Sequence, residues 1–237
     1  MEKRRQEGQI IIDSLCAYIR SSFPLAERHD ELTLSYEEYQ QKYQDKNQVT
    51  QSVENSVDNS TPKPEEHQDN KQSREEFLRD KSIFREEQEV RQTILAEIEK
   101  RLNSNKDKNE DGKGEVKPGT WSYFEYDFLN TVFFYRVGFS NSYFGVFSNF
   151  SESEFIKDAD FSGAKFTWLV DFSRAEFIGN AIFFDAKFTR SVDFSGAKFT
   201  QNANFSGTTS QTPIFESALG NEAMFSYKVK PENYNFK

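Results

Sequence analysis

Two histidines and one cysteine are the residues of this chain best suited to acid–base, metal or nucleophilic chemistry. His29 and His67 both lie in polar stretches, and neither has a catalytic or metal-ligating spacing to Cys16, a serine or a carboxylate. A single cysteine also excludes an intrachain disulfide and a zinc site built from several thiolates. We therefore expect no catalytic residue, no metal and no cofactor, and an enzyme is the least favoured class of function.

Acidic residues recur directly before phenylalanines in the second half of the chain: Glu154, Asp160, Asp171, Glu176 and Asp193. Such a row suggests an acid–base pair or a cation site, but Lys165, Lys187 and Lys198 take equivalent positions. The pattern therefore favours a surface of mixed charge. Lys113 lies beside glycines, yet the Gly-x4-Gly-Lys-Ser/Thr spacing of a phosphate-binding loop is absent.

Charge and hydropathy restrict the class of partner. The net charge of −9 and a pI near 5.0 argue against the phosphate backbone of a nucleic acid as the main partner. No apolar run reaches the ~18 residues of a membrane span, and no secretory leader follows Met1. We expect a cytoplasmic protein without a membrane span, with peripheral contact to the membrane as the alternative.

The first 119 residues predict helices joined by polar linkers. One apolar helical face is formed by Ile12, Leu15, Cys16 and Ile19. Cys16 is thus interpreted as a small buried hydrophobe. Ser35 and Glu38 form a capping box that opens a second helix, and residues 1–46 make an N-terminal helical segment.

A long amphipathic helix is expected between two linkers. Residues 47–72 lack apolar periodicity and contain two prolines, which is typical of a disordered linker. A second capping box, Ser73 with Glu76, opens a helix over residues 73–104 whose apolar stripe must dock on a partner surface. Residues 105–119 form a second linker, rich in charge and glycine.

Phenylalanine recurs with a strict rhythm after residue 120, where 22 of the 25 phenylalanines lie. From Phe128 to Phe205 the steps between them alternate five and six residues, and from Phe133 onward a small or β-branched residue stands two positions before each ring. A helix cannot place every fifth or sixth residue on one face, and a flat strand alternates with a period of two. The rhythm predicts a solenoid whose rings point to its axis.

The sequence DFSGAKFT, at 160–167 and again at 193–200, resembles the pentapeptide-repeat family, whose pattern centres on Leu or Phe with Ala, Ser or Val two positions earlier. The alternating spacing is similar to that of the Phe-centred branch. The resemblance implies a mainly β fold, a right-handed quadrilateral β-helix over residues 120–226 preceded by α-helical segments, with a C-terminal tail or cap at 227–237. LCAYIR at 15–20 and VRQTILAEIEKRL at 90–102 resemble the helical region of actinobacterial relatives.

Four sides of alternating length give a coil of 22 residues. Residues 161–182 and 183–204 are identical at 13 of 22 positions, although an offset of 33 also matches well in one stretch. Outward positions favour the offset of 22, because they then form two apolar columns: Phe134, Ile156 and Ile178 in one, and Val146 and Trp168, flanked by Phe147 and Leu169, in the other.

Exposed apolar columns usually mark an interface. We expect the helix at 73–104 to cover one column, which leaves the other for a protein partner or a second copy of this chain. The leading hypothesis is a non-catalytic interaction or scaffold module. The alternative is an acidic, DNA-mimicking regulator of DNA gyrase or a related topoisomerase, since residues 120–226 hold 12 acidic and 7 basic residues. A membrane-tethered protein acting at the envelope is the third class.

Overall fold

The computed structural model describes residues 2–51, 66–103, 115–210 and 224–225. The chain forms two compact units, the first made of residues 1–22 and 90–237 and the second of residues 23–89. The first unit contains the solenoid, and each unit is described separately below.

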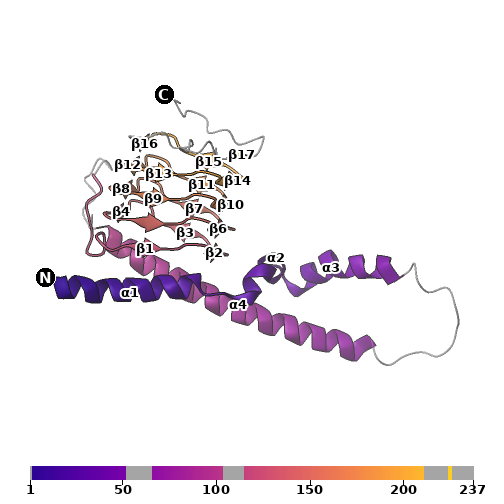
Figure 1. The fold of residues 1–237 in the computed structure, drawn as a ribbon. Coiled ribbons are helices and arrows are strands. Elements are labelled where there is room, and N and C mark those ends of the chain that lie inside the picture. The colour runs from indigo at the N-terminus through magenta and orange to yellow at the C-terminus, as the bar shows by residue number, and fades with distance from the viewer. Residues whose placement is uncertain (1, 52–65, 104–114, 211–223, 226–237) are drawn as a thin grey trace, which may run out of the picture. The chain divides into compact units, whose positions relative to one another are not determined.

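Short parallel strands build the solenoid, which has four sheets and about four turns (Figure 1). Strand bounds are β1 (Tyr126–Asp127), β2 (Val132–Phe133), β3 (Val137–Gly138), β4 (Tyr143–Phe144), β5 (Ser148–Asn149), β6 (Glu154–Phe155), β7 (Ala159–Asp160), β8 (Lys165–Phe166), β9 (Val170–Asp171), β10 (Glu176–Phe177), β11 (Ala181–Ile182), β12 (Lys187–Phe188), β13 (Val192–Asp193), β14 (Lys198–Phe199), β15 (Ala203–Asn204), β16 (Thr209–Ser210) and β17 (Met224–Phe225). The sheets run β1-β5-β9-β13, β2-β6-β10-β14-β17, β3-β7-β11-β15 and β4-β8-β12-β16.

Paired residues from β1 to β16 lie 22 positions apart, as the pairs Phe133↔Phe155 and Phe177↔Phe199 illustrate. The predicted coil length is therefore confirmed. The last pairing differs, because Phe199 aligns with Phe225 and the final coil is longer by four residues. The expected tail at 227–237 lies outside the described residues.

Phenylalanine rings fill the axis of the solenoid, as predicted. Rings 22 residues apart stack face to face, with centroids 4.6–5.8 Å apart and interplanar angles of 2–27°. Phe155 and Phe177, at 4.6 Å and 2°, are the tightest of these pairs. Rings of neighbouring sheets meet edge to face, as Phe161 and Phe172 do at 81°. The residues two positions before the rings, such as Ala159 and Ala181, are buried at the corners.

The corners alternate between two kinds of turn. Four-residue turns join β1 to β2 and β3 to β4, and their third residue adopts a positive φ. This residue recurs every 11 positions: Asn130, Asn141, Glu152, Gly163, Arg174, Asp185, Gly196 and Gly207. Three-residue turns join β2 to β3 and β4 to β5, and both apolar columns predicted from the sequence lie on these shorter turns.

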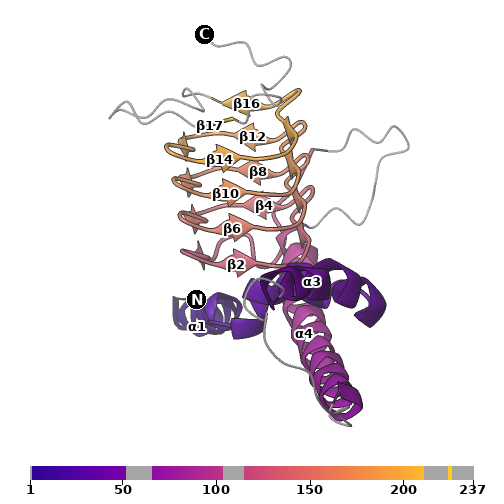
Figure 2. The same ribbon diagram turned by 90° about the vertical axis from the view of Figure 1, so that its right-hand side faces the viewer.

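Helix α1 (Glu2–Arg20) packs against β1 beneath the first coil (Figures 1 and 2). Its Gln9 side chain completes the backbone pairing there, because Nε2 donates to Glu125 O and Oε1 accepts from Glu125 N, both at 2.9 Å. The predicted face is buried at Ile12, Cys16 and Ile19. Burial raises the pKa of the Cys16 thiol to about 12, so this cysteine is protonated and enclosed.

Helix α4 (Glu66–Leu102) ends beneath the first coil as well, with Leu95, Ile98 and Leu102 buried. The buried Arg91 donates to the carbonyls of Ile19 and Ser21 at the end of α1. This arrangement corrects one expectation. Within the described residues, the amphipathic helix closes the end of the solenoid instead of covering a column along its side, because its apolar residues are matched to the unpaired end of the core.

The second unit contains η1 (Pro24–Arg28), α2 (His29–Leu32), α3 (Tyr36–Gln51) and the first part of α4. Phe77 of α4 stacks on Tyr39 at 4.6 Å, and Arg28 Nη1 lies 2.6 Å from Asp80 Oδ2. The apolar stripe of α4 therefore has partners in both units.

Helix boundaries differ from the expected ones at two places. The Ser35–Glu38 capping box is confirmed, since Glu38 N donates to Ser35 Oγ at 3.2 Å and Ser35 N donates to Glu38 Oε2 at 2.7 Å. The prediction that Ser73 opens a helix is wrong, because α4 already begins at Glu66. The residues before Ser73 are mostly polar helix formers, which lengthen the helix without an apolar face. The middle of the expected linker at 47–72 and most of the one at 105–119 lie outside the described residues.

Replacing an axial ring should destabilise the solenoid strongly. Phe183 is fully buried between Phe161 and Phe205, whereas its neighbour Phe184 is 46% exposed. We expect Phe183→Ala to lower the free energy of unfolding by about 3–5 kcal/mol, because it leaves a ring-sized cavity. Phe184→Ala should change it by less than about 0.5 kcal/mol. Chemical denaturation followed by tryptophan fluorescence measures both, and equal effects would contradict the stacked core.

Two buried serines should respond in opposite directions to alanine. Ser142 Oγ is buried without a hydrogen-bond partner in the described part of the chain, and Ala164 and Ala186 stand above it in the next coils. Ser153 Oγ donates to Phe128 O at 2.6 Å. Ser142→Ala should raise the free energy of unfolding by about 1 kcal/mol, and Ser153→Ala should lower it by about 1–2 kcal/mol. The same denaturation assay tests the sign of each change.

Candidate interaction surfaces

The column of Phe134, Ile156 and Ile178 is not an exposed stripe. Phe134 is 1% exposed and Ile156 is 7% exposed, while Ile178 is half-buried. The Arg91 guanidinium lies 5.7 Å from the Phe134 ring centroid, and the Tyr135 ring packs on it at 5.0 Å. The expectation of an apolar surface here is therefore wrong for its first two members, because the helical end cap and neighbouring side chains cover them.

The other column is exposed in its upper part. Trp168 is 46% exposed and Leu169 is 38% exposed, whereas Val146 and Phe147 are half-buried one coil below. These four residues are called the Trp168 patch. The guanidinium of Arg190, which stands one coil above Trp168, lies 3.8 Å from the indole centroid. Cation–π stacking of this kind fixes the orientation of the indole while one face stays available.

The lower part of the Trp168 patch is covered by the segment that leads into the solenoid. Gly145 N donates to Ser122 O at 2.7 Å, and a Cβ on Gly145 would lie 2.6 Å from the same oxygen. Glycine at position 145 thus permits residues 122–123 to lie against the first coil. Val146 and Phe147 lose part of their exposure for this reason.

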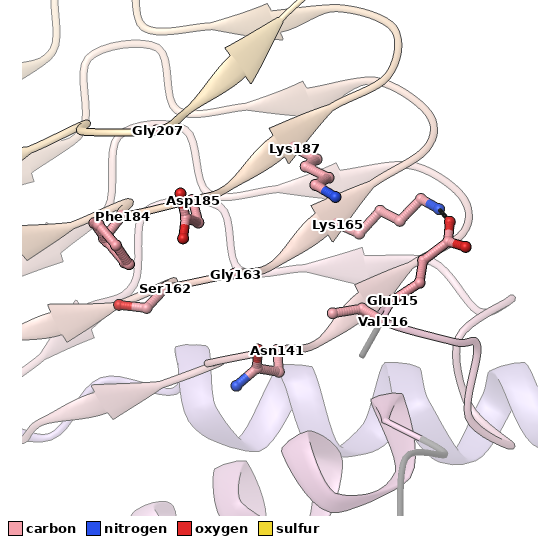
Figure 3. A pocket seen from close by; sticks show the side chains of 10 residues that line it. All are labelled: Glu115, Val116, Asn141, Ser162, Gly163, Lys165, Phe184, Asp185, Lys187 and Gly207. Atoms are coloured by element: carbon pink, nitrogen blue, oxygen red, sulfur yellow. Dashed lines mark hydrogen bonds and ion pairs between the residues drawn. The ribbon is translucent and has the colours of Figure 1, made fainter. Parts of the chain in front are cut away.

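A groove of about 750 Å³ lies on the solenoid beside β8 and β12 (Figure 3). It is lined by Glu115, Val116, Asn141, Ser162, Gly163, Lys165, Phe184, Asp185, Lys187 and Gly207 and is called the lysine groove. Lys165 and Lys187 are register partners on neighbouring strands. The Nζ atom of Lys165 lies 2.9 Å from Glu115 Oε1, and Figure 3 shows this pair at the edge of the groove.

Known proteins can now be compared with this geometry. Residues 161–209 match the family model described as pentapeptide repeats (9 copies). The solenoid belongs to the pentapeptide-repeat family. No curated protein and no solved structure matches the chain.

Carboxylates before the rings stabilise turns of the pentapeptide-repeat solenoid. Asp160 Oδ1 accepts from Ser162 N at 3.0 Å, and Asp171 and Asp193 accept in the same way from serines two residues later, at 2.7 Å. Aspartate favours such turns because its short side chain reaches the backbone two residues on. The Asp-Phe-Ser sequences thus have a structural explanation.

Other candidates for chemistry are placed as follows. Within the described ranges, no group of three or more His, Cys, Asp or Glu side chains is arranged to hold a metal ion. His29 Nδ1 lies 3.2 Å from Ala26 O, and its Nε2 lies 3.1 Å from Asp30 Oδ1. The side chain of His67 is outside the described set. No helix in the described part of the chain has the length and hydropathy needed to cross a membrane.

Two glutamates next to the pentapeptide-repeat solenoid have shifted pKa values of opposite sign. The hydrogen bond from Lys165, together with the charges of Lys165 and Lys187, lowers the pKa of Glu115 below its ordinary value. Burial raises the pKa of Glu99, although a hydrogen bond from Ser140 Oγ at 3.2 Å opposes this effect. The lysine groove is therefore the place where a carboxylate is stabilised in its charged form.

The lysine groove was not predicted from the sequence, where Lys165, Lys187 and Lys198 were treated as equivalent. The 22-residue offset separates them, because it stacks Lys165 on Lys187 and places Lys198 on another sheet, 3.6 Å from Glu176. The contribution of Glu115 has no such signal, since it lies 50 residues from Lys165 in a segment without repeats.

The lowered pKa of Glu115 is directly testable. We expect its carboxyl group to titrate below the ordinary value of 4.5 in the native chain, and to return toward that value in Lys165→Gln. The ion pair should thus be present above the ordinary pKa and lost as the pH falls through the lowered one. A ¹³C NMR titration measures this, with Lys198→Gln as the matched control. An unchanged Glu115 in Lys165→Gln would exclude the pairing.

Proposed function

We propose that this protein is a non-catalytic interaction module that binds a protein partner through the Trp168 patch. The repeat fold provides a long, rigid surface, and fold alone supplies no chemistry. The observation that carries the proposal is an exposed tryptophan and leucine side by side on one turn, at 46% and 38% exposure. Exposed apolar clusters of this kind on a rigid scaffold are typical of binding surfaces.

Tryptophan and arginine are the residue types that contribute most to binding energy at interfaces. Trp168 and Arg190 stack at 3.8 Å, and both are exposed. A partner that covers the indole would also exclude water from the guanidinium, so the pair offers an apolar and a cationic contact together. The half-buried Val146 and Phe147 form the lower rim of the same surface.

Mixed charge along the outer faces argues against the DNA-mimicking alternative. Such a regulator needs continuous negative charge along the solenoid, whereas acidic residues here alternate with bases. Lys198 lies 3.6 Å from Glu176, and Arg174 forms an ion pair with Glu152. The Trp168 patch is a better basis for a function than the acidic excess of the composition.

A photo-cross-linking side chain at position 169 of the full chain tests the proposal. Leu129 is the matched control, because it is 41% exposed on another turn, compared with 38% for Leu169. In cells of the native host, we expect covalent adducts from position 169 and none from position 129. Trp168→Asp should weaken binding of the captured partner at least about 30-fold, the loss expected for a hot-spot residue. Sedimentation velocity distinguishes a second copy of this chain from another protein.

The proposal is wrong if positions 169 and 129 give the same adducts, or if Trp168→Asp binds the captured partner as tightly as the native chain does. Thermal unfolding of the variant checks that the solenoid is intact, since position 168 is on the surface and its replacement should leave stability within about 0.5 kcal/mol.

A further inference from the structure

The lysine groove has a second feature of a binding site, because a peptide segment of the chain itself already lines it. Glu115 and Val116 come from the segment before the solenoid, while the rest of the groove comes from coils 25 or more residues later. Figure 3 shows Glu115 reaching Lys165 from this segment. A carboxylate and a neighbouring apolar side chain thus occupy one edge of the groove.

The positive charge of the groove exceeds what Glu115 supplies. Lys165 and Lys187 are register partners, so their strands are about 4.8 Å apart. Lys165 Nζ lies 2.9 Å from Glu115 Oε1 and 5.5 Å from the Tyr143 ring centroid, and its side chain is 21% exposed. Lys187 is exposed on the next coil. Two ammonium groups at this separation repel each other, and an anion placed between them relieves that repulsion.

The lining also restricts the kind of anion. Asp185 contributes a carboxylate to the same groove, and it disfavours a ligand with several negative charges, such as a nucleic acid or a polyphosphate. Phe184 provides an apolar wall with 46% exposure. A single carboxylate next to an apolar side chain satisfies all three groups, and that is the chemistry of the segment already present.

The internal occupant is held weakly. The Glu115 side chain is 72% exposed, and ion pairs with so much solvent access contribute little to stability. A peptide of similar chemistry can therefore exchange with it. We propose that the lysine groove binds an acidic, extended segment of a partner protein, with Lys165 and Lys187 holding its carboxylate and Phe184 its apolar side chain, and that Glu115 and Val116 occupy the site in the free chain.

This site is separate from the Trp168 patch, and its test is independent of the proposed function. The probe is an acetylated and amidated peptide that copies residues 115–119 (EVKPG), and the control peptide has Gln in place of Glu. Both are titrated into the ¹⁵N-labelled full chain and into Glu115→Gln, Lys165→Gln/Lys187→Gln and Glu152→Gln variants. Glu152 is the matched control because it forms a surface ion pair with Arg174 on another turn.

We expect the EVKPG peptide to shift the amide signals of Lys165 and Lys187 and to bind Glu115→Gln at least about ten-fold more tightly than the native chain, since no tethered carboxylate then competes. Glu152→Gln should behave as the native chain. The Gln peptide should not bind, and the double lysine variant should lose binding while keeping its other amide signals.

Three results would overturn the proposal. Equal binding of the Glu and Gln peptides would remove the role of the carboxylate, and equal binding to Glu115→Gln and the native chain would remove the internal occupant. Displacement of the peptide by an equal concentration of inorganic phosphate would assign the groove to small anions instead. Trp168→Asp should leave all of these titrations unchanged, so failure here is distinguishable from failure of the proposed function.

Discussion

Face-to-face stacking of phenylalanine rings sets the geometry of the whole first unit. Parallel strands lie about 4.8 Å apart, and flat aromatic rings stack at nearly the same spacing. Phe144 and Phe166 show the match directly, with parallel rings 4.7 Å apart on paired strands. Because backbone and core repeat at one distance, each coil rests on the next without tilt. Every outward column, including the Trp168 patch and the two lysines, is a consequence of that shared distance.

The fold of the solenoid could be predicted from the sequence because one residue type marks every corner of the core. The alternating steps between phenylalanines contain the coil length, and small residues such as Ala159 and Ala181 mark the corners. Phe225 shows the limit of this reasoning. Its pairing with Phe199 needs 26 residues instead of 22, and no rhythm in the intervening sequence specifies the longer coil.

The surfaces were harder to predict, because exposure depends on segments outside the repeat. Phe134 and Trp168 have the same outward position on equivalent turns, yet one is 1% exposed and the other 46%. The difference arises from Arg91, whose guanidinium reaches Phe134 from the helical end cap. Nothing in the 22-residue pattern indicates where that helix packs. The lysine groove was missed for a related reason, since Glu115 comes from outside the coils that carry its partners.

The amide of Gln9 affects more than the packing of α1. An open β-sheet edge recruits further strands, and stacked solenoids without a closed end can add to one another indefinitely. Gln9 occupies both the donor and the acceptor of Glu125, next to the edge strand β1, at 2.9 Å each. A side chain that imitates a strand in this way terminates the ladder and blocks growth of fibres from this end of the sheet.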